Sequence, residues 1–498
     1  MSEIIAEKPA RLERLAKLRE AGRNPYPSRV ERSHGIAKVL SHFESFTPEH
    51  KITIVGRVRA LRRHGGVSFL QIEDGTGKMQ ALIQKDVLGE AAYTFAMETI
   101  DMGDFVSASG VVYLTKKGEK SISANEIRII TKALLPLPEK WHGLTDTELR
   151  FRKRHLDLIS NESVREIFRT RSRVHTLLRK FFDEREYMEV DTPILQPLAG
   201  GALAEPFITH HNALGIDLYL RVAPELYLKR LLVGGFERVY EIARCFRNEG
   251  IDATHSPEFT QIEFYQAYSS YEDLMKLIED FFPFLLRGLG KDIKITLGGQ
   301  DIDFTPPYPR LAFRDAILEY TKVDINAFPE AEDLRKKARE IGCDIDSSAP
   351  RGKICDEIYK TFVRPHLIAP TFLIHHPVDL SPLAKRVESD QRYVERCQLV
   401  AGGIELTNGF SELNDPIDQR ARFEDQERAR EAGEKEVQGM DNDFIEALEI
   451  GMPPTAGCGI GIERLLCLLT DSHNLKEVIF FPTLRPAPQT DGGESSGK

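Results

Sequence analysis

Residues 52–124 carry five short stretches of alternating apolar and polar residues, and this pattern constrains the fold more than any other feature. Glycine-containing turns separate most of the stretches, and one helical stretch (residues 86–97) lies between the third and the fourth. Short strands at such regular spacing are typical of small all-β barrels. Five strands with one helical interruption match an OB-type barrel, a fold that often binds oligonucleotides. The strands are expected to begin at Ile52, Val67, Met79, Phe105 and Ser121.

The 498 residues leave room for a second, larger domain. A proline-containing stretch around residues 133–148 marks the boundary between the two domains. Residues from about 270 to 375 are polar and helical in pattern, and we expect them to form a peripheral insertion in the second domain. The expected organisation is an N-terminal helical extension at 1–48, the barrel at 49–140, a linker at 141–150, the second domain at 151–488 and a flexible tail at 489–498.

Charge is distributed unevenly along the chain. The formal net charge of −10 argues at first against a nucleic-acid partner. Residues 1–160, however, contain 26 Lys and Arg against 20 Asp and Glu, a balance of +6, which leaves −16 for the remainder. Within this part, residues 8–23 predict an amphipathic helix with a basic face, which is either a solvated surface helix or a contact for a polyanion.

The cysteine pattern and the lack of a long apolar run bear on the compartment. The six cysteines form no CxxC pair and show no zinc-ligand spacing, so we expect buried thiols in a reducing cytosol. The N-terminus lacks the pattern of a signal peptide, and no run of about 18 apolar residues is present. We therefore expect a cytoplasmic protein that does not contact a membrane.

A long polar hairpin is the first candidate site. Residues 236–247 and 261–268 predict two antiparallel strands joined by a loop. Because side chains alternate between the faces of a strand, Glu241 and Arg247 share one face of the first strand, and Glu263 and Tyr265 share one face of the second. Such a face is either solvent-exposed or the floor of a polar site, and the mixture of small residues with Arg, Glu and Tyr favours the polar site.

Two further segments extend this candidate site. Residues 405–415 predict a strand with Asn408, Phe410 and Glu412 on one face, whereas Glu405 has the opposite parity. Glu405 joins the same face only if the strand has a bulge or a strong twist near residues 407–409. A glycine-rich strand then turns into a helix around Gly461 and Arg464. No Walker A motif or Rossmann fingerprint is present, so a nucleotide would be bound in another way.

These segments make the chain resemble the class II lysyl-tRNA synthetases over nearly its whole length. Three segments resemble motifs 1, 2 and 3 of class II synthetases, namely residues 171–193, 236–263 and 457–466. Their diagnostic residues are Pro193, Phe246-Arg-Asn-Glu and Gly459-Ile-Gly-Ile-Glu-Arg, respectively. Residues 207–213, 220–231 and 408–415 resemble stretches specific to the lysyl enzymes. The resemblance implies an α+β protein, with an OB-type anticodon-binding barrel and a class II catalytic domain built on a mostly antiparallel sheet with flanking helices. It also implies a homodimer formed through motif 1.

The activity implied by the resemblance is ATP-dependent activation of L-lysine, followed by its transfer to the 3′ end of tRNA(Lys). Arg247 and Arg464 are the implied catalytic residues, since two anions must meet in the site. The implied ATP contacts are Arg247, Glu249, His255, Phe259, Glu405, Gly461 and Arg464. The implied lysine contacts are Gly201, Glu225, Arg247, Glu263, Tyr265, Asn408, Phe410 and Glu412.

Magnesium and anticodon contacts follow from the same resemblance. The family commonly binds Mg²⁺ with two acidic residues, of which one matches Glu405 and the other falls at Gln398, an amide. We therefore expect weaker metal binding, or reliance on water and Glu249. The implied anticodon contacts are Arg62, Phe69, Gln80 and Glu119. Phe69 either stacks on a base or faces the barrel core, because the sequence does not set the parity of its strand.

Three other functions fit parts of the sequence. A ligase that attaches lysine to elongation factor P would resemble residues 165–485 but would lack the barrel. An aspartyl or asparaginyl relative would need a basic side-chain pocket, whereas Glu263 and Glu412 make this one acidic. A non-catalytic RNA-binding protein would not need the arginines of motifs 2 and 3.

Overall fold

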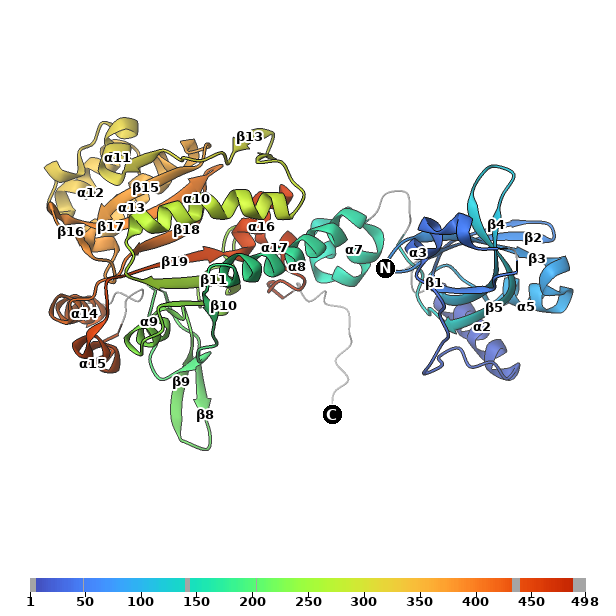
Figure 1. Ribbon diagram of the computed structural model, residues 1–498. Helices are drawn as coiled ribbons and strands as arrows, with labels where there is room; N and C mark the ends of the chain where they lie inside the picture. The colour runs from blue at the N-terminus through green and yellow to red at the C-terminus, as the bar shows by residue number, and fades with distance from the viewer. Residues whose placement is uncertain (1–5, 48, 139–143, 203, 432–438, 487–498) are drawn as a thin grey trace. The chain divides into compact units, whose positions relative to one another are not determined.

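The computed structural model describes residues 6–47, 49–138, 144–202, 204–431 and 439–486 (Figure 1). The chain divides into two compact units, Met1–Leu144 and Thr145–Lys498. Their boundary falls inside the expected linker. The predicted flexible tail at 489–498 lies outside the described residues.

The first unit is built on a closed five-stranded barrel, as the strand pattern predicted. Its strands pair in the order β1-β2-β3-β5-β4, and β3 and β5 are the one parallel pair of this circuit. Alternate side chains point into a common core, which includes Ile54, Leu70 and Ile122. The elements are β1 Ile52–His64, β2 Val67–Glu73, β3 Lys78–Gln84, α4 Lys85–Leu88, α5 Glu90–Thr99, β4 Phe105–Leu114 and β5 Lys120–Thr131.

The segment before the barrel packs onto it. This segment contains α2 (Lys8–Glu20), α3 (Ile36–Ser41) and the short 3₁₀ helix η1 (Phe43–Ser45). Leu18 and Val39 are buried in the barrel core, so the N-terminal extension and the barrel share one hydrophobic core.

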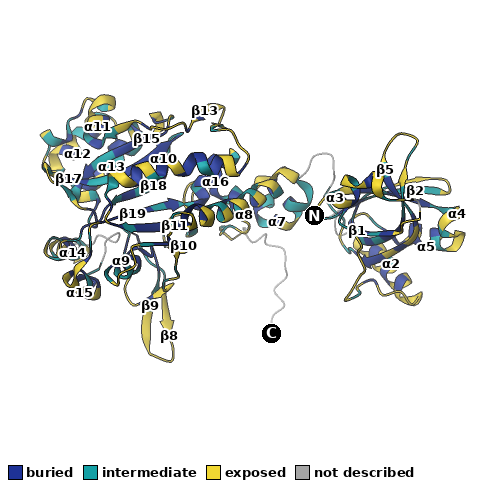
Figure 2. Cartoon of the chain, viewed as in Figure 1, coloured by how far each residue is buried: buried dark blue, intermediate teal, exposed yellow. Residues whose placement is uncertain are grey.

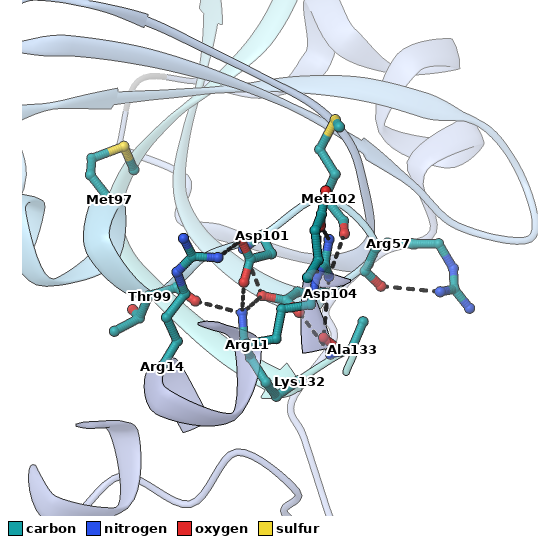
Figure 3. A network of polar contacts seen from close by, with 12 residues as sticks. Arg11, Arg14, Arg57, Met97, Thr99, Asp101, Met102, Asp104, Lys132 and Ala133 are labelled. Carbon is teal, nitrogen blue, oxygen red and sulfur yellow. Dashed lines mark hydrogen bonds and ion pairs between the residues drawn. The ribbon is translucent and has the colours of Figure 1, made fainter. Parts of the chain in front are cut away.

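A buried polar network ties α2 to the barrel (Figure 3). The Lys132 ammonium is 2.5 Å from Asp101 Oδ2 and 2.7 Å from Asp104 Oδ2. Arg11 of α2 donates hydrogen bonds to the backbone carbonyls of Met102 (3.1 Å) and Ala133 (3.2 Å). These bonds join α2 to the turn before β4 and to the residues after β5.

The second unit is organised around a nine-stranded sheet with the order β14-β15-β17-β18-β19-β11-β10-β6, and β16 pairs with β17. All pairs are antiparallel except β14 with β15 and β6 with β10, which agrees with the predicted mostly antiparallel sheet. The strands are β6 Met188–Glu189, β10 Arg238–Phe246, β11 Glu258–Ala267, β14 Arg310–Ala312, β15 Thr371–Pro377, β16 Arg386–Val387, β17 Asp390–Ala401, β18 Ile404–Ser411 and β19 Thr455–Gly461.

Two smaller sheets and the flanking helices complete this unit (Figure 1). The smaller strands are β7 Leu195–Gln196, β8 Ile208–His211, β9 Ile216–Leu220, β12 Lys294–Leu297 and β13 Gln300–Asp303. The α-helices are α6 Thr147–Arg152, α7 Arg154–Ser160, α8 Glu162–Asp183, α9 Glu225–Val233, α10 Tyr271–Gly288, α11 Phe313–Thr321, α12 Ala331–Glu340, α13 Arg351–Phe362, α14 Pro416–Glu431, α15 Asn442–Gly451, α16 Ile462–Thr470 and α17 Leu475–Val478. The 3₁₀ helices are η2 Ile325–Ala327, η3 Arg364–His366 and η4 Val378–Leu380.

One helix begins before motif 1, and one expectation about the helices needs correction. The stretch that resembles motif 1 begins at Arg171, whereas α8 begins at Glu162, because Val164 and Phe168 continue its buried stripe. The stretch 270–375 is not a peripheral helical insertion as a whole. α10 packs in the main core through Phe281 and Phe282, and β14 and β15 belong to the central sheet. Only α11, α12 and α13 form a separate helical cluster with a core of their own.

Candidate active site

The polar hairpin contributes to a large pocket of the second unit. Strands β10 and β11 pair so that Glu241 lies opposite Glu263. One face of this hairpin packs into the main core through Tyr240, Ile262 and Phe264. The opposite face contributes Glu263 and Tyr265 to a pocket of about 1020 Å³. Because neighbouring residues of a strand point to opposite faces, the chain can bury an apolar surface and build a polar site with one hairpin.

Nearly all the residues that the resemblance assigned to ATP, lysine and Mg²⁺ line this pocket. They are Gly201, Glu225, Arg247, Glu249, His255, Phe259, Glu263, Tyr265, Gln398, Glu405, Asn408, Phe410, Gly461 and Arg464. Glu412 is set behind this lining and is only 1% exposed. Glu241 does not line the pocket, since its carboxylate pairs with Arg221 at 2.5 Å and accepts a hydrogen bond from Thr192 Oγ1.

A bulge in β18 brings Glu405 and Asn408 to the same pocket despite their opposite parity. Leu399 of β17 pairs with Thr407, but the next residue, Val400, pairs with Glu405. Leu406 is therefore the extra residue, and the bulge lies just before the expected positions 407–409. A bulge of this kind re-aims the side chains on one side of it.

Arg247 and Arg464 are two of the guanidinium groups that line the pocket without an ion pair to a described residue. Arg247, which follows β10, forms no ion pair with a described residue, and its buried Nε has no hydrogen-bond partner there. Its guanidinium lies 5.0 Å from the centre of the Phe259 ring. Arg464, on the first turn of α16, likewise forms no ion pair within the described part of the chain. Unpaired cations in a pocket are suited to bind an anionic ligand.

Glu463 fixes the helix that carries Arg464. Its carboxylate pairs with Arg171 of α8 at 2.8 Å and accepts a hydrogen bond from the backbone N–H of Thr260 at 2.9 Å. The elements that correspond to motifs 1, 2 and 3 therefore meet at this one buried carboxylate.

The other end of the pocket is acidic. Glu225, Glu263 and Glu412 are all buried. Burial raises the pKa of each carboxyl, and the nearby Lys229 ammonium opposes the rise. Glu263 also accepts hydrogen bonds from Gln261 Nε2 (2.6 Å) and the Tyr265 hydroxyl (3.4 Å). An environment of several buried carboxylates attracts ligands with ammonium groups.

The loop between β10 and β11 places His255 at the mouth of the pocket. His255 is exposed and pairs with Asp252 at 2.8 Å. The small burial of Asp252 opposes ionisation, but hydrogen bonds from Thr254 and His255 outweigh it and lower the pKa of Asp252 to about 2.

The two predicted magnesium ligands lie on neighbouring strands. Glu405 and Gln398 both line the pocket, and the Gln398 amide oxygen is 3.0 Å from His376 Nε2. Among the described residues, no group of three His, Cys, Asp or Glu side chains is arranged to hold a metal ion. Mg²⁺ is usually held by one or two carboxylates together with substrate phosphates. The Glu405 carboxylate and the Gln398 amide oxygen fit such a shared site and not a site made by protein alone.

The predicted anticodon residues lie on the barrel of the first unit. Ser68 is buried and Phe69 is half-buried, so Phe69 faces outward. Arg62 pairs with Phe69 across β1 and β2, and Gln80 of β3 donates a hydrogen bond to Ser121 Oγ at 3.1 Å. Glu119 is exposed in the turn before β5.

Sequence reasoning missed two residues of the acidic end, Lys229 and Gly457. The Lys229 ammonium is 2.7 Å from Glu225 Oε1 and also pairs with Glu412. A Cβ on Gly457 would lie 2.2 Å from Tyr265 Cε1 and 2.5 Å from Glu412 Oε1, so only glycine fits there. The sequence holds one signal for Lys229, its i,i+4 spacing from Glu225, but exposed helical pairs have the same spacing.

Comparison with known proteins agrees with this geometry. Residues 146–485 match the family of class II tRNA synthetases (D, K and N), and residues 52–130 match the OB-fold nucleic acid binding domain of the anticodon-binding type. The chain is 48% identical to a lysine–tRNA ligase of Moorella thermoacetica, over 96% of this chain and 97% of the relative. It is also 48% identical to a lysine–tRNA ligase of Chloroflexus aurantiacus, over 97% and 99%. The chain therefore belongs to the class II tRNA synthetases, and within them to the family of the lysine–tRNA ligases.

Proposed function

We propose that this protein activates L-lysine with ATP and transfers the lysyl group to the 3′ end of tRNA(Lys). The observation that carries the proposal is one pocket that combines cationic and acidic side chains: Arg247 and Arg464, which form no ion pair with a described residue, and the buried Glu225 and Glu263, with the buried Glu412 behind them. Such a pocket matches a ligand set of phosphates, a carboxylate and two ammonium groups. The lysine–tRNA ligases similar to this chain over nearly their whole length support the same substrates.

In the first reaction, the lysine carboxylate attacks the α-phosphate of ATP, and pyrophosphate leaves. Both reacting groups are anions, so the site must supply positive charge and alignment more than acid–base catalysis. The planar guanidinium of Arg247 bridges the carboxylate and the α-phosphate, and Arg464 binds the terminal phosphates. Phe259 stacks on adenine, while Glu249 and His255 border the nucleotide and Gly461 allows its close approach.

Selection of lysine takes place at the acidic end. Glu225 and Glu263, with Gly201 close by, receive the α-ammonium group, while Glu412 and Tyr265 receive the ε-ammonium group. Phe410 packs on the aliphatic stem beside Asn408. An amino acid without the ε-ammonium group would leave a buried carboxylate unpaired, which is costly and gives strong discrimination.

Magnesium completes the site when ATP is present. The ion supplies positive charge against the phosphate oxygens, and Glu405 with the Gln398 amide oxygen are the residues that would hold it. The amide contributes no charge, so we propose that this position binds the metal more weakly than a carboxylate would.

In the second reaction, the 3′-terminal hydroxyl of tRNA(Lys) attacks the activated carbonyl, and adenosine monophosphate leaves. The barrel would select the tRNA, with Phe69 stacking on an anticodon base and Gln80, Glu119 and Arg62 contacting the bases around it. Splayed single-stranded bases are commonly read by such aromatic and polar pairs. The match of residues 52–130 to a nucleic acid binding domain supports this role.

We also propose a homodimer formed through the motif 1 region. Large apolar side chains are exposed at Met188, near the end of motif 1, and in the segments that follow motif 1 as far as residue 236. Figure 2 shows the exposed hairpin β8–β9. The exposed residues are Met188, Ile194, Leu195, Leu198, Ile208, Leu214, Ile216 and Phe236.

A cytoplasmic location fits the cysteines, which are all free and buried. Within the described residues, no helix is both long and apolar enough to cross a membrane.

Charging assays test the proposed function. We expect lysine-dependent exchange of pyrophosphate into ATP, and lysine attachment to a tRNA with a lysine anticodon. Activation without tRNA charging, together with lysine attachment to elongation factor P, would favour a protein ligase and contradict the second reaction.

A further inference from the structure

Lys229 occupies the acidic end of the pocket although no motif assigned it a role. It lies on α9, one turn after Glu225, and its side chain is 0% exposed. Its ammonium group is 2.7 Å from Glu225 Oε1, pairs with Glu412, and lies 5.4 Å from the centre of the Phe410 ring. Two carboxylates that are proposed to receive the ammonium groups of the substrate therefore already share an ammonium group of the protein.

The number of ammonium groups at the acidic end equals the number of carboxylates only when Lys229 is counted with the substrate. The acidic end contains three carboxylates, Glu225, Glu263 and Glu412, against the single ammonium of Lys229. The substrate brings two more ammonium groups, and its own carboxylate is taken by Arg247. The occupied end then holds three ammonium groups against three carboxylates. Without Lys229, one buried carboxylate would stay unpaired, and unpaired buried charge is costly.

The surroundings of Glu412 make Lys229 its direct counter-ion. Burial raises the pKa of Glu412, Lys229 lowers it, and Glu225 and Glu263 raise it further. The charged and titratable groups facing the cluster are Glu225 and Lys229 of α9, Glu241 of β10, Arg247, Glu263 and Tyr265 of β11, Arg396 of β17, Glu412, and Cys458 of β19.

The second oxygen of Glu412 remains available. Glu412 Oε1 is buried and has no hydrogen-bond partner among the described residues. It packs against Gly457, which lines the pocket. A buried acceptor without a donor beside a pocket marks the place of a ligand's donor group.

We propose that Lys229 is a positioning residue for lysine selection, whose ammonium group keeps Glu412 ionised and leaves Oε1 free for the ε-ammonium group of the substrate. The proposal rests on the proposed function, lysine activation. Lys229 then supplies one of the three ammonium groups that balance the three carboxylates when lysine is bound.

The test compares Lys229→Met with the wild type in lysine-dependent pyrophosphate exchange between about pH 6 and pH 8. Without Lys229, the pKa of Glu412 rises further, so the carboxyl must release a proton when lysine binds. We expect the KM for lysine to fall more steeply with rising pH in the variant than in the wild type, by up to about tenfold more per pH unit, the limit for one additional proton. The wild type should show a flatter profile, and the KM for ATP should stay unchanged.

Lys132→Met is the matched control. Lys132 is equally buried and also pairs with two carboxylates, Asp101 and Asp104, but it lies in the barrel (Figure 3). We expect it to lower stability and to leave the pH profile of the lysine KM as in the wild type. Equal slopes for Lys229→Met and the wild type would overturn the role of Lys229, whereas absence of lysine-dependent exchange in the wild type would overturn the proposed function itself.

A second measurement needs no variant. Calorimetry of lysine binding to the wild type, in buffers of different ionisation enthalpy, counts the protons released. We expect at most about one proton, from Glu263, which has no ammonium partner among the described residues of the empty pocket. Release of two protons would show that Glu412 is protonated beside Lys229 and would contradict the proposal.

Discussion

Gly457 sets how closely Tyr265 and Glu412 approach strand β19. A Cβ at this position would overlap both side chains. Gly457→Ala must therefore displace groups proposed to bind the ε-ammonium group. Overpacking of this kind costs about 1–3 kcal/mol, so we expect a rise in the lysine KM of about ten- to hundredfold, with little change in the ATP KM.

Gly459→Ala is the control on the same strand. Its nearest contact would be Glu263 Cγ at 3.5 Å, an ordinary van der Waals distance. Pyrophosphate exchange measures both variants. A Gly459→Ala effect on the lysine KM as large as that of Gly457→Ala would contradict this reading of the strand.

Gln398 is proposed above to bind Mg²⁺ through an amide oxygen that carries no charge. Gln398→Glu adds a charge beside Glu405, because the two residues line the same pocket. We expect the Mg²⁺ concentration for half-maximal exchange to fall by about tenfold, which corresponds to about 1.4 kcal/mol. Gln391→Glu, at the exposed start of β17, should leave it unchanged. An unaltered Mg²⁺ dependence of Gln398→Glu would remove the idea of a weakened metal site.

At the scale of elements, the hairpin β8–β9 has an exposed apolar surface that a second copy of the chain would cover. Ile208 is 63% exposed on this hairpin. We expect Ile208→Asp to weaken the dimer at least tenfold, which is about 1.4 kcal/mol, as measured by sedimentation across a range of concentrations. Ile417→Asp is the control, since Ile417 is 81% exposed on α14, away from motif 1. A dimer weakened equally by both substitutions, or a monomer in the wild type, would contradict an interface at motif 1.

Elements with strong local signals were predicted well. The barrel strands were recognised because glycine turns and the alternation of apolar and polar residues can be read within each short segment. The hairpin β10–β11 was recognised because polar residues recur at every second position of its strands. The bulge in β18 was predicted from parity alone, since Glu405 and Asn408 had to share a site.

Elements that depend on tertiary packing were predicted poorly. The segment containing α10 looked peripheral because its neighbours in sequence are polar, but Phe281 and Phe282 are buried in the main core. The orientation of Phe69 stayed open because one residue of register reverses the faces of a strand. Lys229 went unnoticed because a lysine four residues after a glutamate is typical of an exposed helix, and only the fold brings Glu412 to it.

At the scale of the whole molecule, the chain divides its two recognition tasks between two units of different charge. The net charge of −10 combines a basic first third with an acidic remainder. If the barrel reads tRNA and the pocket activates lysine, a change on the barrel should affect charging and leave activation intact.

Phe69→Ala tests whether tRNA recognition by the barrel is separate from lysine activation in the pocket. Loss of base stacking is worth about 1–3 kcal/mol, so we expect kcat/KM for tRNA to fall about ten- to hundredfold. Lysine-dependent pyrophosphate exchange without tRNA should be unchanged. Met102→Ala serves as the control, because Met102 is another apolar residue of the first unit and is exposed. Loss of pyrophosphate exchange in Phe69→Ala would contradict the separation of the two tasks.

The most direct test of the account is pyrophosphate exchange measured with each of the twenty amino acids in turn. The account predicts that L-lysine alone supports exchange, and that Arg247→Met abolishes it while the variant stays folded. Equal exchange with aspartate or asparagine, or exchange that survives Arg247→Met, would contradict the claim that this pocket selects and activates lysine.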